Sequence, residues 1–212
     1  MDTAIATPSV AASVATPTSV SVLAPGFENP TYDSIKVFRA VANAMAKPGA
    51  IFQVHARPPA PVQLSPACAA LCLTLLDADT PLWIQNNLPL VSDYLRFHCG
   101  CPITPHEGEA SFALVNNIVA MPELDVFNAG SAEYPDDSAT LLIQVSSLSN
   151  ATGVKLSGPG LREAMVLDAA GVSADYWRAL QASRSRFPLG VDIIFTCGEH
   201  IAALPRTTQV TL

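Results

Sequence analysis

The chain is poor in charge. Asp, Glu, Lys and Arg make up 14% of its 212 residues, whereas soluble domains average about 25%. Eighteen acidic against eleven basic residues give a net charge of -7, and no Lys/Arg cluster interrupts this balance. Because a negative chain repels phosphate backbones, we expect no nucleic-acid partner. A surface with so few charges is expected to be partly covered by a protein partner.

Long apolar runs are also missing. Apolar residues make up 50% of the chain, enough for the core of one sizeable domain, but the best run, Ala67 to Leu76, has only ten residues. A bilayer crossing needs about 20, so we expect no membrane-spanning helix. The chain opens Met1-Asp2 and has no basic residue before Lys36, which removes the positive region of a signal peptide. Five cysteines, an odd number, fit a reducing cytoplasmic location.

Motifs for catalysis and metal binding are absent as well. The sequence contains no GxxxxGK[ST], GxGxxG or GxSxG, so phosphate-cradling loops and a hydrolase nucleophile turn are not expected. The cluster His98-Cys99-Gly100-Cys101 offers three potential zinc ligands. A closed zinc site needs four, and no second pair follows at the usual spacing. Cys68 and Cys72 lie in an apolar helix, where a small hydrophobic role is expected. We therefore expect no metal site and no cofactor.

The cationic residues supply the remaining ligand candidates. Arg184, Arg206 with the adjacent Thr207, and Arg96 beside His98 combine guanidinium and hydroxyl donors that suit phosphate or carboxylate. The alternative is that they are exposed or interface residues in ordinary ion pairs.

Only three lysines could form a Schiff base. Lys36 and Lys47 belong to the first expected helix and the turn that ends it, where a solvated role is expected. Lys155, in an expected strand, is the remaining candidate, although strand lysines usually point to solvent.

Helices and strands alternate after residue 26. We predict helices at 31–47, 65–77, 91–97 and 174–184, and strands at 51–55, 81–85, 111–115, 140–147, 154–157, 191–196 and 201–204. The first helix is expected to place Ile35, Phe38, Val41, Ala42 and Met45 on its apolar face. Residues 140–147 form a nearly unbroken apolar run, typical of a strand covered on both faces. This alternation, with a closing hairpin, predicts an α/β layered fold with a mixed sheet and an antiparallel edge.

The domain organisation follows from composition. Residues 1–26 consist mainly of Ala, Val, Ser, Thr and Pro without periodicity, which predicts a flexible N-terminal arm. Residues 27–212 are expected to form a single α/β domain.

Six segments, in order and spacing, resemble the H subunit of the bacterial carbon-phosphorus lyase core complex from about residue 27 to the end. They are FRAVANAMAKPGAI (38–51), LTLLDADTPLWI (73–84), LRFHCGCPI (95–103), AGSAEYPDDSATLLIQVSSLS (129–149), LSGPGL (156–161) and FPLGVDIIFTCGEHIAALPRTT (187–208). The Cys99-Gly100-Cys101 pair is not part of the family pattern and is treated as local variation.

The resemblance implies a role in organophosphonate catabolism. In that pathway a complex of G, H, I and J subunits transfers phosphonate to the ribose C1 of ATP with release of adenine, giving a ribose 1-phosphonate 5-triphosphate. The implied fold is a three-layer α/β/α arrangement with a mixed sheet, similar to a shortened pyridoxal-phosphate transferase without its cofactor site. The family implies a homodimer in isolation and supplies no catalytic residue, so an accessory role is expected. The alternatives are a small-ligand binding protein for phosphonate or nucleotide and a stand-alone pyridoxal-phosphate enzyme using Lys155.

Overall fold

The computed structural model describes residues 23–212, so residues 1–22 of the expected arm lie outside the described residues. The helices are α1 (Pro30–Ala46), α2 (Pro66–Leu75), α3 (Pro89–Cys99) and α4 (Ala174–Arg184). The strands are β1 (Ile51–Gln53), β2 (Leu82–Ile84), β3 (Phe112–Val115), β4 (Thr140–Gln144), β5 (Leu148–Ser157), β6 (Met165–Ala169), β7 (Asp192–Cys197), β8 (His200–Leu204) and β9 (Gln209–Thr211). Short 3₁₀ helices occur at Glu107–Glu109, Ile118–Ala120, Leu124–Val126 and Pro135–Asp137.

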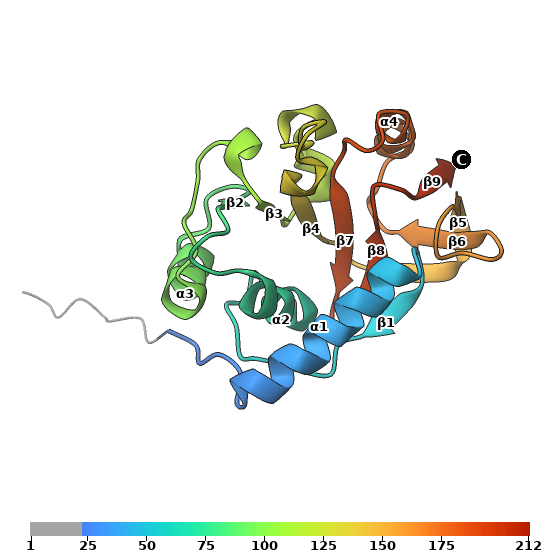
Figure 1. Ribbon diagram of the computed structural model, residues 1–212. Helices are drawn as coiled ribbons and strands as arrows, with labels where there is room; N and C mark the ends of the chain where they lie inside the picture. The colour runs from blue at the N-terminus through green and yellow to red at the C-terminus, as the bar shows by residue number, and fades with distance from the viewer. Residues whose placement is uncertain (1–22) are drawn as a thin grey trace, which may run out of the picture.

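A six-stranded sheet forms the centre of the molecule (Figure 1), in the order β1-β8-β7-β4-β3-β2. Strands β2, β3, β4 and β7 are parallel neighbours, whereas β8 runs antiparallel to both β7 and β1. The predicted α/β class with a mixed sheet and an antiparallel edge is confirmed. So is the closing hairpin, in which Cys197 is paired with His200.

A second, three-stranded antiparallel sheet was not predicted. It has the order β6-β5-β9, and β5 starts at Leu148, six residues before the predicted strand. Residues 149–153 are polar or small and mostly exposed, so they carry no apolar alternation. Strand β9 buries only Val210, which is too little for a periodic signal.

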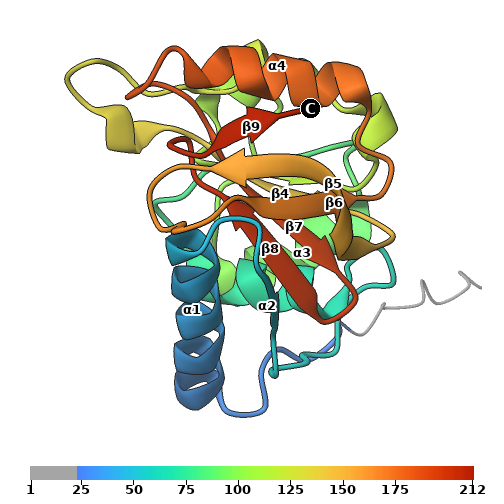
Figure 2. The same cartoon turned by 90° about the vertical axis from the view of Figure 1, so that its right-hand side faces the viewer.

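The large sheet is covered on both faces, but by different layers. Helices α1, α2 and α3 pack on one face and form one hydrophobic cluster with it. The small sheet and α4 pack on the other face and form a second cluster. Figure 2 shows the small sheet and α4 above α1 and α2. One outer layer is thus helical and the other combines a sheet with a helix. No helix within residues 23–212 has the length and apolar character needed to cross a membrane.

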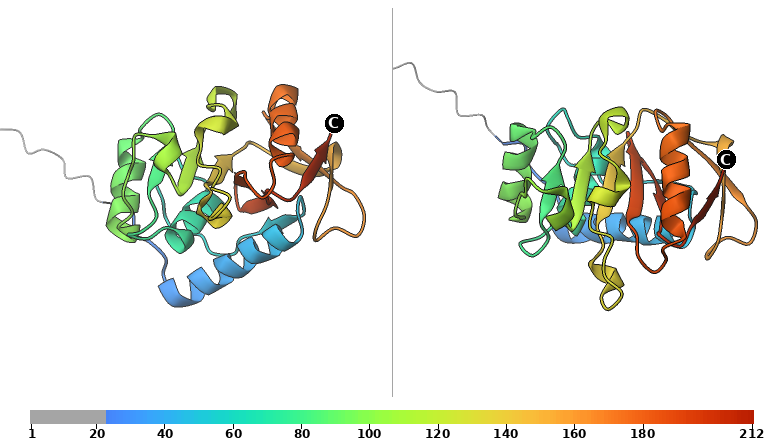
Figure 3. Two further views of the ribbon diagram at one scale, coloured as in Figure 1. Left: turned by 45° about the horizontal axis from the view of Figure 1, so that its top comes forward. Right: turned by 90° about the horizontal axis from the view of Figure 1, so that it is seen from above.

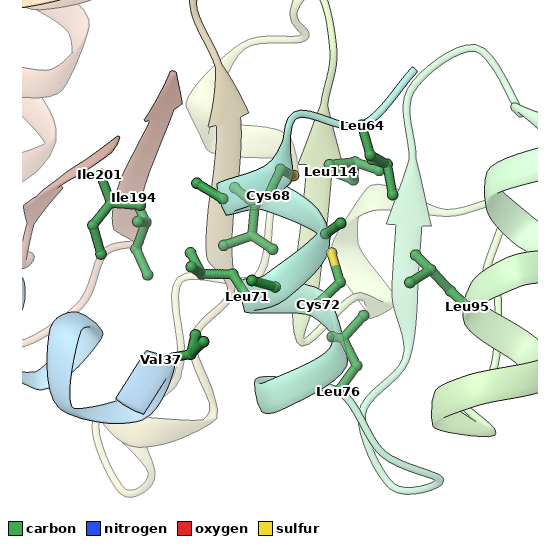
Figure 4. Packing of buried hydrophobic residues seen from close by; sticks show 14 of the residues in the cluster. Val37, Leu64, Cys68, Leu71, Cys72, Leu76, Leu95, Leu114, Ile194 and Ile201 are labelled. Carbon is green, nitrogen blue, oxygen red and sulfur yellow. The ribbon is translucent and has the colours of Figure 1, made fainter. Parts of the chain in front are cut away.

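Helix α2 lies at the centre of the helical layer. Ser65 caps it by accepting a hydrogen bond from the Cys68 backbone N–H at 3.3 Å, and Pro66 occupies its first turn, as predicted. The six residues from Ala67 to Cys72 are all buried. Figure 4 shows Leu71 of this helix between Val37 of α1 and Ile194 of β7.

Helix α1 differs from its prediction in the face that it buries. It begins at Pro30, where Asn29 is the cap, and it ends before Pro48-Gly49 as expected. Its buried residues are Val37, Val41 and Ala44, whereas Ile35, Phe38 and Ala42 are exposed. The predicted face is right for Val41 and for the partly buried Met45, and it is wrong for the other three residues because apolar residues occur on both sides of the helix. The smaller side chains let α1 approach α2 and β8 more closely.

Candidate functional site

The ligand candidates fall into two separate groups. Arg184, Arg206 and Thr207 lie at the end of α4 and in the connection from β8 to β9, while Arg96 and His98 lie on α3. Helices α3 and α4 cover opposite faces of the large sheet (Figure 3). The arginines therefore do not converge on a single site.

Arg184 is 2% exposed and bonds to backbone carbonyls. Its Nη1 donates to the Val191 carbonyl oxygen at 2.8 Å, and its Nη2 donates to that of Leu204 at 3.4 Å. The side chain thus ties the last turn of α4 to the start of β7 and the end of β8.

Arg206 makes a similar connection close by, since a Cβ atom on Gly190 would lie 3.7 Å from Arg206 Cβ and 3.8 Å from Arg184 Nη1. Its Nη1 donates to the Pro135 carbonyl oxygen and, at 2.6 Å, to Ser138 Oγ. Its backbone N–H donates to Asp192 Oδ1 at 2.7 Å, and its Nη2 lies 3.7 Å from Asp192 Oδ2. Asp192 therefore balances the charge of Arg206, whereas Arg184 forms no salt bridge with any residue of the described range.

Arg184 and Arg206 together form a cluster, the Arg184–Arg206 cluster, that keeps a positive charge at the end of α4. Burial lowers the pKa of Arg184 to about 10, and the nearby Asp192 carboxylate partly opposes this effect, so the guanidinium remains charged at neutral pH. Two buried polar atoms here have no hydrogen-bond partner: Arg184 Nε and the Tyr176 hydroxyl. The Arg184 charge acts on Tyr176, whose own pKa is raised by burial. These groups suit an anion, although most guanidinium donors already serve the protein.

Thr207 is half-buried and lies against a neighbouring turn. A Cβ atom on Gly158 would come within 3.0 Å of the Thr207 carbonyl oxygen, and Gly158 has a φ of +126°, so only glycine fits this position. Residues 158–160 form a turn, and Thr207 borders it.

His98 contacts the segment that enters the domain. Its Nε2 lies 2.9 Å from the Ala24 carbonyl oxygen, and a Cβ atom on Gly26 would approach Nδ1 to 3.1 Å. The ring also stacks edge-on against Tyr94, with the centroids 4.6 Å apart. Both ring nitrogens therefore face protein atoms, while Arg96 is exposed on the same helix.

Lys155 is exposed on β5. It pairs with Val166 and Thr211 across the small sheet, and its neighbours Val154 and Leu156 point into the core. A Schiff-base lysine needs a desolvated position or a cationic neighbour to become nucleophilic. Lys155 is exposed to solvent on the outer face of the small sheet, so its position is not desolvated.

A groove of about 580 Å³ runs between α4 and the segment 118–125. Ile118, Met121 and Leu124 give it an apolar wall, and Glu123, Asp125 and Asp175 make its rim acidic. A 2.5 Å ion pair joins Arg186 to Asp125. The rim carboxylates would repel a phosphonate or a triphosphate. No pattern in the sequence indicates this groove, because short 3₁₀ helices form one side of it.

Cysteines from α2 and α3 meet in the helical layer. Cys99 Sγ lies 3.6 Å from the Cys72 carbonyl oxygen, and Cys68, Cys72, Cys99 and Cys101 are all free thiols. A hydrogen bond with Cys68 and burial raise the pKa of Cys72, and burial raises that of Cys99 to about 12. Such thiols stay neutral and react slowly. Over residues 23–212, no three His, Cys, Asp or Glu side chains are grouped so as to hold a metal ion.

Comparison with known proteins identifies the family. The family described as "Bacterial phosphonate metabolism protein (PhnH)" matches residues 25–211. The chain is 35% identical over 188 residues to the alpha-D-ribose 1-methylphosphonate 5-triphosphate synthase subunit PhnH of Rhizobium meliloti (strain 1021), covering 87% of this chain and 93% of that protein. It is also 37% identical over 83 residues to HtxG of Stutzerimonas stutzeri, provisionally named a C-P lyase subunit protein, covering 39% of this chain and 43% of that protein. The resemblance found in the six sequence segments is confirmed, and the chain belongs to the PhnH family of bacterial phosphonate metabolism proteins.

Proposed function

We propose that the chain is a subunit of the carbon-phosphorus lyase core complex. In this role it supports transfer of phosphonate to the ribose C1 of ATP with release of adenine, without supplying catalytic residues of its own. The observation that carries the proposal is the match to the Rhizobium meliloti synthase subunit over 87% of the chain.

The geometry of the reactive side chains supports an accessory role. Arg184 bonds to two backbone carbonyls, Arg206 is engaged by Pro135, Ser138 and Asp192, and His98 by the Ala24 carbonyl oxygen. The thiols of Cys72 and Cys99 are held neutral by their surroundings. Within the described residues, these groups stabilise the fold and offer little free donor capacity.

The partners follow from the same proposal. We expect the G, I and J subunits to bind the chain in the complex and a second copy to bind it in isolation, in the cytoplasm. The low charge content supports a surface that is partly covered. The exposed position of Lys155 supports the lack of a Schiff-base site at this residue, and the shortened transferase fold without a cofactor site belongs to the same proposal. The arm up to residue 26 remains a prediction.

The direct test is co-expression of a tagged chain with the G, I and J subunits, followed by affinity purification. Adenine release from ATP in the presence of methylphosphonate is then compared with and without this chain. We expect a stable complex and loss of adenine release when the chain is omitted. A chain that purifies alone, with full activity in the remaining subunits, would contradict the proposal.

The second candidate is binding of a small anion at the Arg184–Arg206 cluster. The charge of Arg184, which forms no salt bridge within the described residues, and the unpartnered Arg184 Nε and Tyr176 hydroxyl favour this function. Calorimetry with methylphosphonate and with ATP tests it on the isolated chain. Heat that disappears in Arg206→Ala but persists in Arg96→Ala would support binding there, and no heat from either ligand would exclude it.

The stand-alone pyridoxal-phosphate enzyme has no structural observation in its favour, given where Lys155 lies. A Schiff-base absorbance band after incubation with pyridoxal phosphate, abolished in Lys155→Ala, would be needed to revive it.

A further inference from the structure

Helix α1 presents an uncovered apolar stripe. Tyr32, Ile35 and Phe38 are 66%, 45% and 59% exposed, and Ala42 is exposed as well. Ile35, Phe38 and Ala42 are spaced i, i+3 and i+7, so they lie on one face of the helix. Over residues 23–212, no other element carries more than two exposed large hydrophobic side chains. We call Tyr32, Ile35, Phe38 and Ala42 the α1 stripe.

A shallow hollow lies beside the α1 stripe. It has a volume of about 300 Å³ and is lined by Ile35, Phe38 and Arg39 together with Ser34 and, from α2, Thr74. A hollow between two helices next to exposed aromatic and aliphatic groups can receive an anchoring side chain, which is how a few residues dominate the energy of many interfaces. Helix α1 lies on the outer side of the molecule along its whole length (Figures 1 and 2), so its free face is open to a partner.

The charge around the α1 stripe is opposite to that of the chain. Helix α1 and its C-terminal cap carry Lys36, Arg39 and Lys47 but only one acid, Asp33, a local charge of about +2 in a chain of -7. Asp33 already pairs with Lys36 at 3.4 Å. Arg39 and Lys47 are exposed and form no salt bridge within residues 23–212. A partner with acidic groups around an apolar centre complements this face.

We infer that α1 docks an acidic surface of another subunit of the complex, with the α1 stripe as the apolar centre and Arg39 and Lys47 as the charged rim. The inference rests on the proposed function and names the surface that this function uses. A second copy of the chain would bring two positive faces together, which is unfavourable. Residues 1–22 contain a single charge, Asp2, and so cannot balance the rim.

Two pairs of variants test the inference in the full chain co-expressed with the G, I and J subunits. Phe38→Asp places a charge in the α1 stripe, and Val119→Asp is its control, because Val119 is 82% exposed beside α4. Arg39→Glu reverses a rim charge, and Lys155→Glu makes the same charge change on the exposed side of β5. Circular dichroism checks that each variant folds, and size-exclusion chromatography of each isolated chain gives its oligomeric state.

Phe38→Asp should weaken capture of the other subunits by about tenfold or more, as expected for a central interface residue. Arg39→Glu should weaken capture at low salt and reduce its salt dependence, while both controls bind like the wild type. If the wild type is captured and Phe38→Asp is captured equally well, the inference is wrong although the proposed function stands. If the wild type is never captured, the proposed function itself fails. If Phe38→Asp instead turns a dimer of the isolated chain into a monomer and leaves capture unchanged, the face joins two copies and the inference is overturned.

Discussion

Replacement of Arg184 by methionine separates a structural role from a binding role. The Arg184 guanidinium donates to the carbonyl oxygens of Val191 and Leu204 and forms no salt bridge within the described residues. Methionine keeps the apolar part of the side chain and removes every donor. If the main role of the arginine is to satisfy these carbonyls, Arg184→Met destabilises the protein without any ligand.

The magnitude follows from the two bonds. A buried carbonyl that loses its donor costs about 1–3 kcal/mol, which applies in full to Val191 at 2.8 Å and only weakly to Leu204 at 3.4 Å. Removing a buried charge that lacks a carboxylate partner returns part of this cost. We expect a net loss of about 1–3 kcal/mol, or roughly 2–12 °C in Tm for a chain of this size.

Urea unfolding and thermal melting of the wild type, Arg184→Met and Arg178→Met measure this difference. Arg178 is a suitable control, because its side chain is 63% exposed and it pairs only with the 91% exposed Asp175, so its loss should cost no more than about 0.5 kcal/mol. If Arg184→Met is as stable as the wild type, the carbonyl bonds do not matter and the structural interpretation of Arg184 is wrong.

Three further predictions concern thiols and the entry segment. Because a hydrogen bond with Cys68 and burial raise the pKa of Cys72 above the ordinary 9.0, the unfolded chain loses this proton first. The free energy of unfolding should then fall above about pH 9, by up to about 1.4 kcal/mol per pH unit, and urea unfolding of Cys72→Ala should show a flatter pH slope; equal slopes would contradict this. In the folded protein, iodoacetamide should modify Cys197, which is half-buried, before Cys99, whose pKa is about 12. Mass spectrometry after increasing reaction times gives the order. Modification of Cys99 first would show that its thiol is not held neutral. His98→Ala removes the contact with the Ala24 carbonyl oxygen, so proteinase K should cleave this variant near residues 23–27 faster than the wild type. The control is His106→Ala, which changes an exposed histidine. Equal cleavage rates in the two variants would mean that His98 does not hold this segment.

The sequence predicted best those elements whose signal is local. Helix α4 has the predicted bounds 174–184, because Ser173 caps it and accepts a hydrogen bond from the Tyr176 N–H. Strands β6 and β9 were missed because they bury few residues and pack against the core on only one face. The small sheet depends on pairing across residues far apart in the chain, which single-segment periodicity cannot reveal.

The candidate site shows the same limit. Arg184 and Arg206 were identified by residue type, but their partners come from distant segments: Asp192 starts β7, and Ser138 precedes β4. Conversely, Arg96 and His98 are neighbours in sequence, yet one is exposed and the other is held by Ala24. Residue type and proximity in sequence therefore suggested donors without showing what they donate to.

The positions of the few charges indicate from which side a partner can approach the chain. Of the eleven basic residues, Arg184 and Arg206 are withdrawn from the surface, and Lys36, Arg57, Arg178 and Arg186 are paired with acids. Two of the remaining five, Arg39 and Lys47, lie on α1 and its C-terminal cap with the α1 stripe, whereas the other three are on separate segments. Since the rest of the chain is acidic, an acidic partner is repelled from most approaches and attracted to one face. A surface with few charges can thus still favour one docking direction, because two of its unpaired cations, Arg39 and Lys47, lie on the helix that carries the apolar groups the partner must cover.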